Sequence, residues 1–219
     1  MPRWLDQSLL VLDVETTGLD PRAHRIVEIA LVAIERGNIL PGIAWLTNPG
    51  SPIPPEATEI HGIGDDDVAS ADPFHALAST LAEAMSGAIP VAYNAPFDRG
   101  FIGAEWLRAD PYGLMPAALH PASRWLDPLV WIRERDRYVK GEGRHRLSVT
   151  CARRGVEHGD AHRAKGDALA CARLLVKLGT EGKIPADLDE ALSQQYALAK
   201  EQEARHRAWV ESRANGASL

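Results

Sequence analysis

Asp13 and Glu15 lie close together in the segment VLDVETTGL at 11–19, directly after a short apolar run. Alternate residues of a β-strand point to the same face, so the two carboxylates are expected to project together. Side by side at the end of a buried strand, they repel each other unless a cation neutralises them. Hard oxygen ligands at adjacent positions suit Mg²⁺ or Mn²⁺. Alone, the segment predicts either a metal site or two acids that reach solvent at a strand end.

A third acid, Asp98, lies in the segment VAYNAPFDRGFI at 91–102, where a strand is expected to run into a helix. Asp98 falls in the first turn of that helix. The helix dipole favours an acid there even without a metal, and Asn94 could be only the N-cap. This segment therefore leaves a ligand and a purely structural role open for Asp98.

The segment HRAKGDALACARLL at 162–175 carries a histidine and a fourth acid. His162 precedes an expected helix and Asp167 lies near its start, so both could reach one point near the helix N-terminus. A histidine beside a metal site can act as a general base at neutral pH. The chain has eight histidines, so His162 alone carries little weight.

An α/β fold is expected to position these residues. Apolar patterning predicts a buried strand at 8–14, an antiparallel hairpin of 26–35 and 38–47 around Arg36-Gly37, and a strand at 89–93. Capping and helical periodicity predict helices at 72–86, 96–109, from Asp127-Pro128 onward, 146–154, 164–178 and 187–213. Three strands followed by alternating strand and helix indicate a sheet with helices packed on it.

VLDVETTGL, NAPFD and the H-x₄-D spacing, in this order, resemble the three motifs of the DEDDh branch of the DnaQ-like 3′–5′ exonuclease family. That family includes the proofreading epsilon subunit of bacterial DNA polymerase III and ribonuclease T. The resemblance spans residues 8–180 and includes IVEIALVAI and the segment IHGIGDDDV at 60–68. It implies a ribonuclease H-like mixed β-sheet flanked by helices. We therefore expect an exonuclease domain at 1–180 and a C-terminal helical extension at 181–219.

The resemblance also implies a mechanism. Four carboxylates would hold two divalent ions, Mg²⁺ or Mn²⁺, about 4 Å apart; these are Asp13, Glu15, Asp98 and Asp167. By position, Asp13 would bridge both ions, Glu15 and Asp167 would complete the first site, and Asp98 would act mainly through the water shell of the second. His162 would take a proton from the water that attacks the terminal phosphodiester. The expected product is a nucleoside 5′-monophosphate.

The substrate end must be single-stranded or frayed to reach such a site. Leu19, Ile60 and Phe97 match family positions that wedge or stack the last two bases, and stacking tolerates any base. Ordinary core or rim packing is the alternative for each of them. His61 and the backbone near Thr16 match family positions around the terminal nucleotide and its 3′ hydroxyl.

Two polar residues near these motifs are interpreted differently. Asn94 is expected to orient the substrate site. Asp127 is instead interpreted as the cap of the helix that begins at Pro128, and it is left out of the site.

Several functions share these motifs. We expect an enzyme that acts on the 3′ end of DNA, in replication proofreading or DNA repair. Trimming of RNA 3′ ends is the alternative within the enzyme class, and only three phenylalanines for base stacking tilt the choice towards DNA. A catalytically silent nucleic-acid-binding module would be expected to have lost a carboxylate or the histidine, and none is lost. An unrelated α/β protein would not explain three motifs in the right order.

The charge of the chain is uneven. The net charge is −6, which argues mildly against a large nucleic-acid surface. Between Arg133 and Lys165, however, the chain contains ten Lys and Arg residues and five Asp and Glu residues, which gives a local net charge of +5. This stretch predicts either a solvated surface or a patch that holds phosphates.

Composition indicates a globular cytoplasmic protein with no membrane partner. No apolar run is long enough to span a bilayer, and the N-terminus lacks the cleavage site of a signal peptide. Cys151 and Cys171 are expected to be buried free thiols.

The C-terminal helix has two possible roles. It could pack back on the domain through Leu188, Leu192, Tyr196 and Leu198, or it could dock a second copy or a partner such as a DNA polymerase.

Overall fold

The central element of the fold is the strand β1 (Ser8–Thr16). The computed structural model describes residues 2–110, 115–120 and 123–216. β1 pairs antiparallel with β2 (Ile26–Glu35) and parallel with β5 (Ile89–Val91). β3 (Asn38–Ile39) and β4 (Ile43–Leu46) both pair antiparallel with β2, giving the order β3-β2-β1-β5. The mixed sheet with flanking helices confirms the predicted ribonuclease H-like α/β fold.

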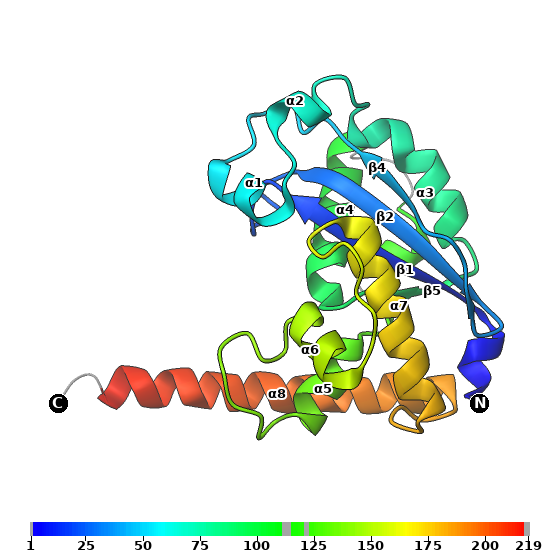
Figure 1. Cartoon of the computed structure of the whole chain (residues 1–219), viewed down its shortest axis with the longest axis vertical. Coiled ribbons are helices and arrows are strands. Elements are labelled where there is room, and N and C mark those ends of the chain that lie inside the picture. Colours follow the sequence, from blue (N-terminus) through cyan, green and yellow to red (C-terminus); the bar gives the residue numbers. More distant parts are fainter. Residues whose placement is uncertain (1, 111–114, 121–122, 217–219) are drawn as a thin grey trace.

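The two faces of β1 and β2 follow the alternation of their side chains. Leu9 and Val11 point to one face and pack with buried residues of α7 (Ala164–Thr180). Leu10 and Leu12 point to the other face and pack with α3 (Ala78–Met85) and α4 (Ala95–Ala109). Figure 1 shows α7 crossing one face of the sheet. Because β1 is covered on both faces, its sequence is a nearly continuous apolar run.

Short elements cover one end of the sheet. α1 (Pro55–His61) and α2 (Asp65–Val68) pack a small apolar cluster, including Ile53, Ile63 and Val68, against Val27 of β2. They form the upper part of the molecule in Figure 1. The remaining short elements are the 3₁₀ helices at Arg3–Asp6, Phe74–Leu77 and Ala117–Leu119.

The lower part of the molecule is helical. α5 (Pro128–Arg135) and α6 (Leu147–Arg154) lie beside α7, and the long helix α8 (Leu188–Gly216) runs beneath them (Figure 1). No helix in the described ranges is both long and apolar enough to cross a membrane.

Polar bonds as well as apolar contacts hold α8 against the body of the protein. Leu192 is buried in the core cluster that contains α7, and Leu188 and Leu198 pack against that cluster. Tyr196 is 63% exposed and lines a cavity of about 530 Å³ together with Pro96 and Trp125, so its predicted apolar contact is at most partial. The carboxamide of Gln195 accepts a hydrogen bond from the Asp127 N–H at 2.8 Å and donates one to the Trp125 carbonyl at 2.8 Å. The division at 180/181 stays a prediction.

Two element boundaries differ from those predicted. The helix expected from residue 72 begins with a 3₁₀ turn, and its α-helical part starts only at Ala78; such turns are common at helix N-termini. The strand expected at 38–47 is divided into β3 and β4 around Pro41, which has no N–H for a ladder bond. The expectation of buried free thiols at Cys151 and Cys171 is confirmed.

Candidate active site

Three carboxylates meet at the end of β1. Asp13, Glu15 and Asp167 each place a ligand oxygen within 4.8 Å of the others. Asp13 and Glu15 continue the face of β1 that α7 covers, and Asp167 lies in the first turn of α7. The period of the strand and the docking of α7 therefore bring together acids that are more than 150 positions apart in the chain.

The fourth acid, Asp98, approaches from α4 on the opposite face of the sheet. It is 3% exposed, and its Oδ1 accepts a hydrogen bond from the Val14 N–H at 3.1 Å. This bond fixes the Asp98 carboxylate beneath the backbone between Asp13 and Glu15. Of the four predicted acids, Asp13, Glu15 and Asp167 thus form one group, and Asp98 is their buried neighbour.

Burial and mutual repulsion disfavour the charged forms of these acids. Burial raises the pKa of Asp13 well above its usual range, and the charges of Asp98, Asp167 and Glu15 raise it further. The pKa of Glu15 is raised to about 8, first by burial and then by Asp167. Burial also raises the pKa of Asp98 and that of Asp167. All-oxygen donors that repel one another in a partly buried position fit a divalent cation such as Mg²⁺ or Mn²⁺.

These pKa shifts predict a stability that depends on pH and on metal. A carboxyl whose pKa is raised by folding stabilises the fold below its unfolded pKa of about 4, and that contribution is lost as pH rises through the folded value. For Glu15 the loss extends to about pH 8. In EDTA, the melting temperature is therefore expected to fall between about pH 5 and about pH 8.

Added Mg²⁺ or Mn²⁺ should raise the melting temperature more at the higher pH, because the carboxylates are then already charged. At a hundredfold excess over Kd the gain is about 2.7 kcal/mol. Thermal denaturation with EDTA, Mg²⁺ and Mn²⁺ at both pH values measures it. An equal metal effect at both pH values would show that these acids are not the ligands.

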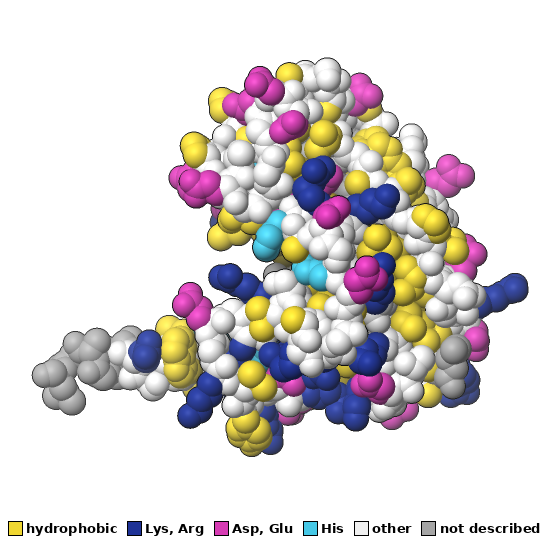
Figure 2. Space-filling model, viewed as in Figure 1, with side chains coloured by type: hydrophobic (Ala, Val, Ile, Leu, Met, Phe, Trp, Pro, Cys, Tyr) yellow, Lys and Arg dark blue, Asp and Glu magenta, His cyan; other side chains and the backbone are white. Residues whose placement is uncertain are grey.

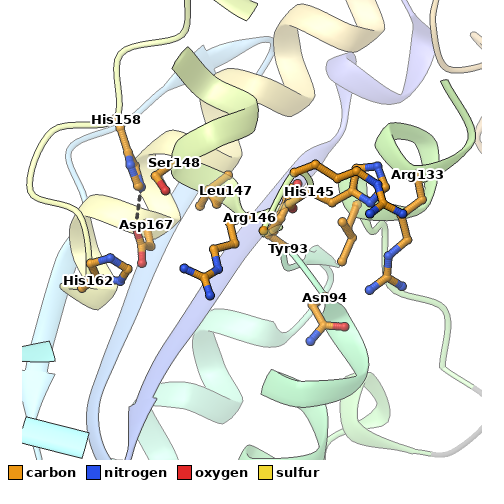
Figure 3. Close-up of a pocket in the computed structure, with 13 residues that line it drawn as sticks. Tyr93, Asn94, Arg133, His145, Arg146, Leu147, Ser148, His158, His162 and Asp167 are labelled. Atoms are coloured by element: carbon orange, nitrogen blue, oxygen red, sulfur yellow. Dashed lines mark hydrogen bonds and ion pairs between the residues drawn. The ribbon is translucent and has the colours of Figure 1, made fainter. Parts of the chain in front are cut away.

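Two histidines stand beside Asp167. His158 and His162 line a cavity of about 470 Å³ together with Asp167 (Figure 3). The Nε2 atom of His158 lies 2.5 Å from Oδ1 of Asp167. His162 is exposed, and its backbone is left-handed at φ 64°, a conformation that costs energy in a residue other than glycine. Sequence reasoning did not single out His158, which lies four positions before His162.

Gly166 allows the loop that carries His158 and His162 to cross the start of α7. A Cβ atom at this position would lie 1.9 Å from the carbonyl oxygen of Asp160, so no other residue fits without moving the loop. The close crossing places the loop that carries His158 and His162 over Asp167. The glycine within the H-x₄-D segment is thus explained by packing.

Glu28 ties this loop to the sheet. It stands opposite Glu15 in the β1–β2 register and is 3% exposed. Its carboxylate accepts hydrogen bonds from Arg163 Nε at 3.1 Å, from Arg163 Nη2 at 2.6 Å and from the Ala164 N–H at 2.9 Å. Glu28 therefore orients the N-terminus of α7. The pattern of the segment IVEIALVAI does not indicate this contact, because Arg163 lies 135 positions from Glu28.

Removal of the Glu28 side chain should loosen α7 and lower activity. In Glu28→Ala the buried N–H of Ala164 loses its acceptor, which costs about 1–3 kcal/mol. Glu28→Gln can keep that bond and should lose less. Chemical denaturation and turnover on single-stranded DNA measure the two effects. If Glu28→Ala matches the wild type in both, this carboxylate does not position α7.

Asp127 holds the start of α4 as well as the start of α5. Its carboxylate caps α5 through the Leu129 N–H at 2.9 Å, as predicted. It also accepts hydrogen bonds from the N–H groups of Asn94 and Ala95, both at 3.0 Å, and burial raises its pKa to about 6. The Asn94 side chain makes no cap bond, and Asn94 instead lines the cavity, with a left-handed φ of 76°.

The apolar residues predicted to meet the bases differ in exposure. Leu19 is 83% exposed and Ile60 is 61% exposed, which is unusual for aliphatic side chains of this size. Phe97 is partly buried and packs against Phe101, with ring centroids 4.9 Å apart. Leu19 and Ile60 are thus free to contact a ligand, whereas Phe97 also serves the core.

The two polar residues of this group are buried. The Oγ1 of Thr16 donates a hydrogen bond to the Gly18 carbonyl at 2.6 Å. His61 is 4% exposed, and its Nδ1 accepts a bond from the Ile63 N–H at 3.1 Å, so its Nε2 carries the hydrogen. That Nε2 is buried without a hydrogen-bond partner in the described structure. Burial lowers the pKa of His61, and an interaction of the ring with the Thr16 backbone opposes this shift.

Comparisons with known proteins agree with this geometry. The family model RNase_T, described as "Exonuclease", matches residues 10–175. DNA polymerase III PolC-type of Streptococcus pneumoniae (strain D39) is 33% identical over 170 residues, which are 78% of this chain and 11% of the polymerase. The corresponding polymerase of Bacillus cereus is 31% identical over 174 residues, again 11% of its length. The chain thus spans only a small part of these relatives.

Solved structures show the same fold. Exonuclease X, in complex with 5′ overhanging duplex DNA, is 25% identical with a TM-score of 0.64, covering 85% of this chain and 99% of that chain. Escherichia coli exonuclease I, in a complex with single-stranded DNA, is 21% identical with a TM-score of 0.67, covering 80% and 41%. Together with the motifs at Asp13, Asp98 and Asp167, these matches show that the chain belongs to the DnaQ-like, DEDDh-type branch of the exonuclease family.

Proposed function

We propose that this chain is a metal-dependent 3′–5′ exonuclease that removes nucleoside 5′-monophosphates from the single-stranded or frayed 3′ end of DNA. The observation that carries the proposal is the meeting of Asp13, Glu15 and Asp167 within 4.8 Å, with buried Asp98 below them. Family membership supports the reaction class.

The four acids are proposed to hold two divalent ions, Mg²⁺ or Mn²⁺. Bound there, such ions would supply activation of water and neutralisation of charge on the phosphodiester. The protein contributes a fixed set of oxygen donors. Asp98 is held by the Val14 N–H, and Asp167 is held by the docking of α7 through Glu28.

His162 is proposed as the general base that accepts the proton of the attacking water. Its place on an exposed loop beside the cavity lets it approach a bound strand end, and a positioned base of this kind contributes about 10²–10⁴-fold. His158, which contacts Asp167, is proposed to help hold that carboxylate when no substrate is bound.

The 3′ end of the strand is proposed to contact the apolar and polar residues that surround the carboxylates. Leu19, Ile60 and Phe97 would contact the last bases without reading their sequence. The Nε2–H of His61 would donate a hydrogen bond near the terminal 3′ hydroxyl, next to the backbone of Thr16. Asn94, at the mouth of the cavity, would orient the strand.

DNA is the favoured substrate because two similar proteins were solved in complex with DNA. Exonuclease X carries 5′ overhanging duplex DNA and exonuclease I carries single-stranded DNA. Similarity to a segment of PolC-type polymerases favours a role in replication or repair, and a DNA polymerase as partner.

Product analysis tests the proposed function. Single-stranded DNA, duplex DNA with a mispaired 3′ end, and RNA of the same sequence would each be incubated with Mg²⁺ or Mn²⁺. We expect nucleoside 5′-monophosphates as the product, faster from DNA than from RNA, and none with EDTA. Faster release from RNA would assign RNA 3′-end trimming, and no release from any substrate would favour a binding module.

A further inference from the structure

A second cavity continues the catalytic one away from the carboxylates. The catalytic cavity has a volume of about 470 Å³ and its neighbour about 830 Å³. Their walls share four residues: Asn94, Arg133, Arg144 and His145. The larger cavity, here called the α8 groove, lies between the α5–α6 region and α8. The α8 side is formed by Ala199, Gln202, Glu203, Arg205 and His206.

Arginines dominate the charge of this continuous groove. Five of them line the two cavities: Arg133, Arg137, Arg144, Arg146 and Arg205. Arg133, Arg144 and Arg146 are exposed, and none of them belongs to an ion pair between residues that the structure describes. In Figure 3 the guanidinium of Arg146 points into the space between Asp167 and Asn94.

The acids in the same walls are already engaged. Asp127 is buried and accepts backbone hydrogen bonds, and Asp167 belongs to the carboxylate group. Glu203 is paired with Arg207 at 2.9 Å. The unpaired charge that the groove presents is therefore positive, and arginine binds phosphate oxygens in a planar, two-pronged geometry.

The part of the molecule that holds α1 and α2 carries charge of the opposite sign. α1 and α2 carry exposed acids, among them Glu56, Glu59 and Asp66. Figure 2 shows a hollow between the part that holds α1 and α2 and the part that holds α8, with Lys and Arg side chains concentrated on the α8 side. A polyanionic strand that leaves the carboxylates is attracted towards α8 and repelled by α1 and α2.

We propose that the α8 groove binds the phosphodiester backbone of single-stranded DNA on the 5′ side of the reacting end. This inference rests on the proposed function, because the α8 groove continues the cavity that Asp167 lines. Tyr138, which lines the groove and is 80% exposed, offers an aromatic surface of the kind that single strands use for stacking. The family match ends at residue 175, so α8 lies outside the part of the chain that the family model matches.

A pair of substitutions on α8 tests the role of this helix. Ala199 lines the groove, whereas Ala197, two positions earlier, is exposed and lines neither cavity. Ala199→Glu should raise the Kd for single-stranded DNA several-fold, and Ala199→Lys should lower it. Ala197→Glu and Ala197→Lys are the matched controls and should change the Kd much less. Opposite effects of the two charges at 199 cannot come from damaged packing, and equal effects at both positions would overturn the proposal.

The arginines are tested by the salt dependence of binding. The double variant Arg133→Gln, Arg144→Gln should weaken binding on the order of tenfold and reduce the log–log salt slope by about 0.7 for each lost phosphate contact. The control is Arg3→Gln, Lys177→Gln, which removes the same charge at one exposed and one partly buried position outside both cavities. Fluorescence anisotropy in EDTA measures both, because the strand is then not cut.

Substrate length separates failure of this inference from failure of the proposed function. Ala199→Glu should raise KM for a strand of about 20 nucleotides and leave a trinucleotide unchanged, because Ala199 lines the α8 groove and not the catalytic cavity, so that only the longer strand reaches it. If the wild type is active and the variant has an unchanged KM for the longer strand, the proposed role of the α8 groove is wrong, while the proposed exonuclease activity stands. If the wild type cuts no substrate, the anisotropy measurements still test whether the α8 groove binds single-stranded DNA. An RNA strand that loses more affinity than DNA would assign the groove to RNA and contradict the proposal.

Discussion

Replacement of Asp13 by Asn is expected to lower turnover on the order of 10³-fold or more while making the metal-free protein more stable. Asp13 is the acid whose pKa is raised by burial together with the charges of Asp98, Asp167 and Glu15. Asn fills the same volume without the charge, so the repulsion within the group falls and a divalent cation loses a ligand. In EDTA near about pH 8 the melting temperature should rise, by about 2–4 °C for each kcal/mol gained.

Measuring both turnover and melting temperature distinguishes the loss of a metal ligand from a loss of folding. Turnover on single-stranded DNA and thermal denaturation would be measured for Asp13→Asn and for Glu35→Gln. Glu35 is an exposed acid at the far end of β2, and its replacement should leave turnover unchanged. Wild-type turnover in Asp13→Asn, or a lower melting temperature in EDTA, would contradict the assignment of Asp13 to a group of partly buried ligands that repel one another.

The two histidines are expected to differ sharply. His162→Ala should lower kcat by about 10²–10⁴-fold, the range that a positioned general base contributes. His158→Ala should lower kcat much less, because His158 contacts the Asp167 carboxylate and is not proposed to take the proton. Single-turnover kinetics with saturating Mg²⁺ measure the chemical step for both variants.

Each histidine variant serves as the control for the other, since both side chains line the same cavity. The reverse order of effects would transfer the base role to His158. Equal losses in both would indicate that the loop acts as one unit. In either case the H-x₄-D spacing would no longer identify the base.

Local rules made the acids of the site predictable. The alternation of β1 placed Asp13 and Glu15 on one face, and first-turn positions placed Asp98 and Asp167 at helix starts. The structure brings three of these acids together and holds Asp98 beside them, as the motifs implied. Their roles as metal ligands stay a prediction.

The residues that sequence reasoning missed depend on contacts between distant segments. Glu28 holds Arg163 across 135 positions, and Asp127 holds the Asn94 N–H across 33 positions. Neither partner can be read from the period of a strand or helix. His158 reaches Asp167 only because Gly166 allows the loop to cross α7.

The large exposed fraction of Tyr196 has a similar origin. α8 is oriented by hydrogen bonds from Gln195 to Trp125 and from Gln202 to the Val130 carbonyl, both at 2.8 Å. An apolar stripe predicts the buried face of a helix only where apolar contact sets its rotation. On α8 these polar bonds contribute to the rotation, and Tyr196 remains exposed.

The direction of digestion is the most direct test of the proposed 3′–5′ exonuclease. A single-stranded oligonucleotide would be labelled at its 5′ end in one sample and within its last 3′ nucleotide in another, and each would be incubated with Mg²⁺. We expect the 3′ label to appear at once as a mononucleotide while the 5′-labelled strand shortens stepwise, with neither change in EDTA or in Asp13→Asn. Early release of a mononucleotide from the 5′ end, or cuts within the strand, would contradict the assignment.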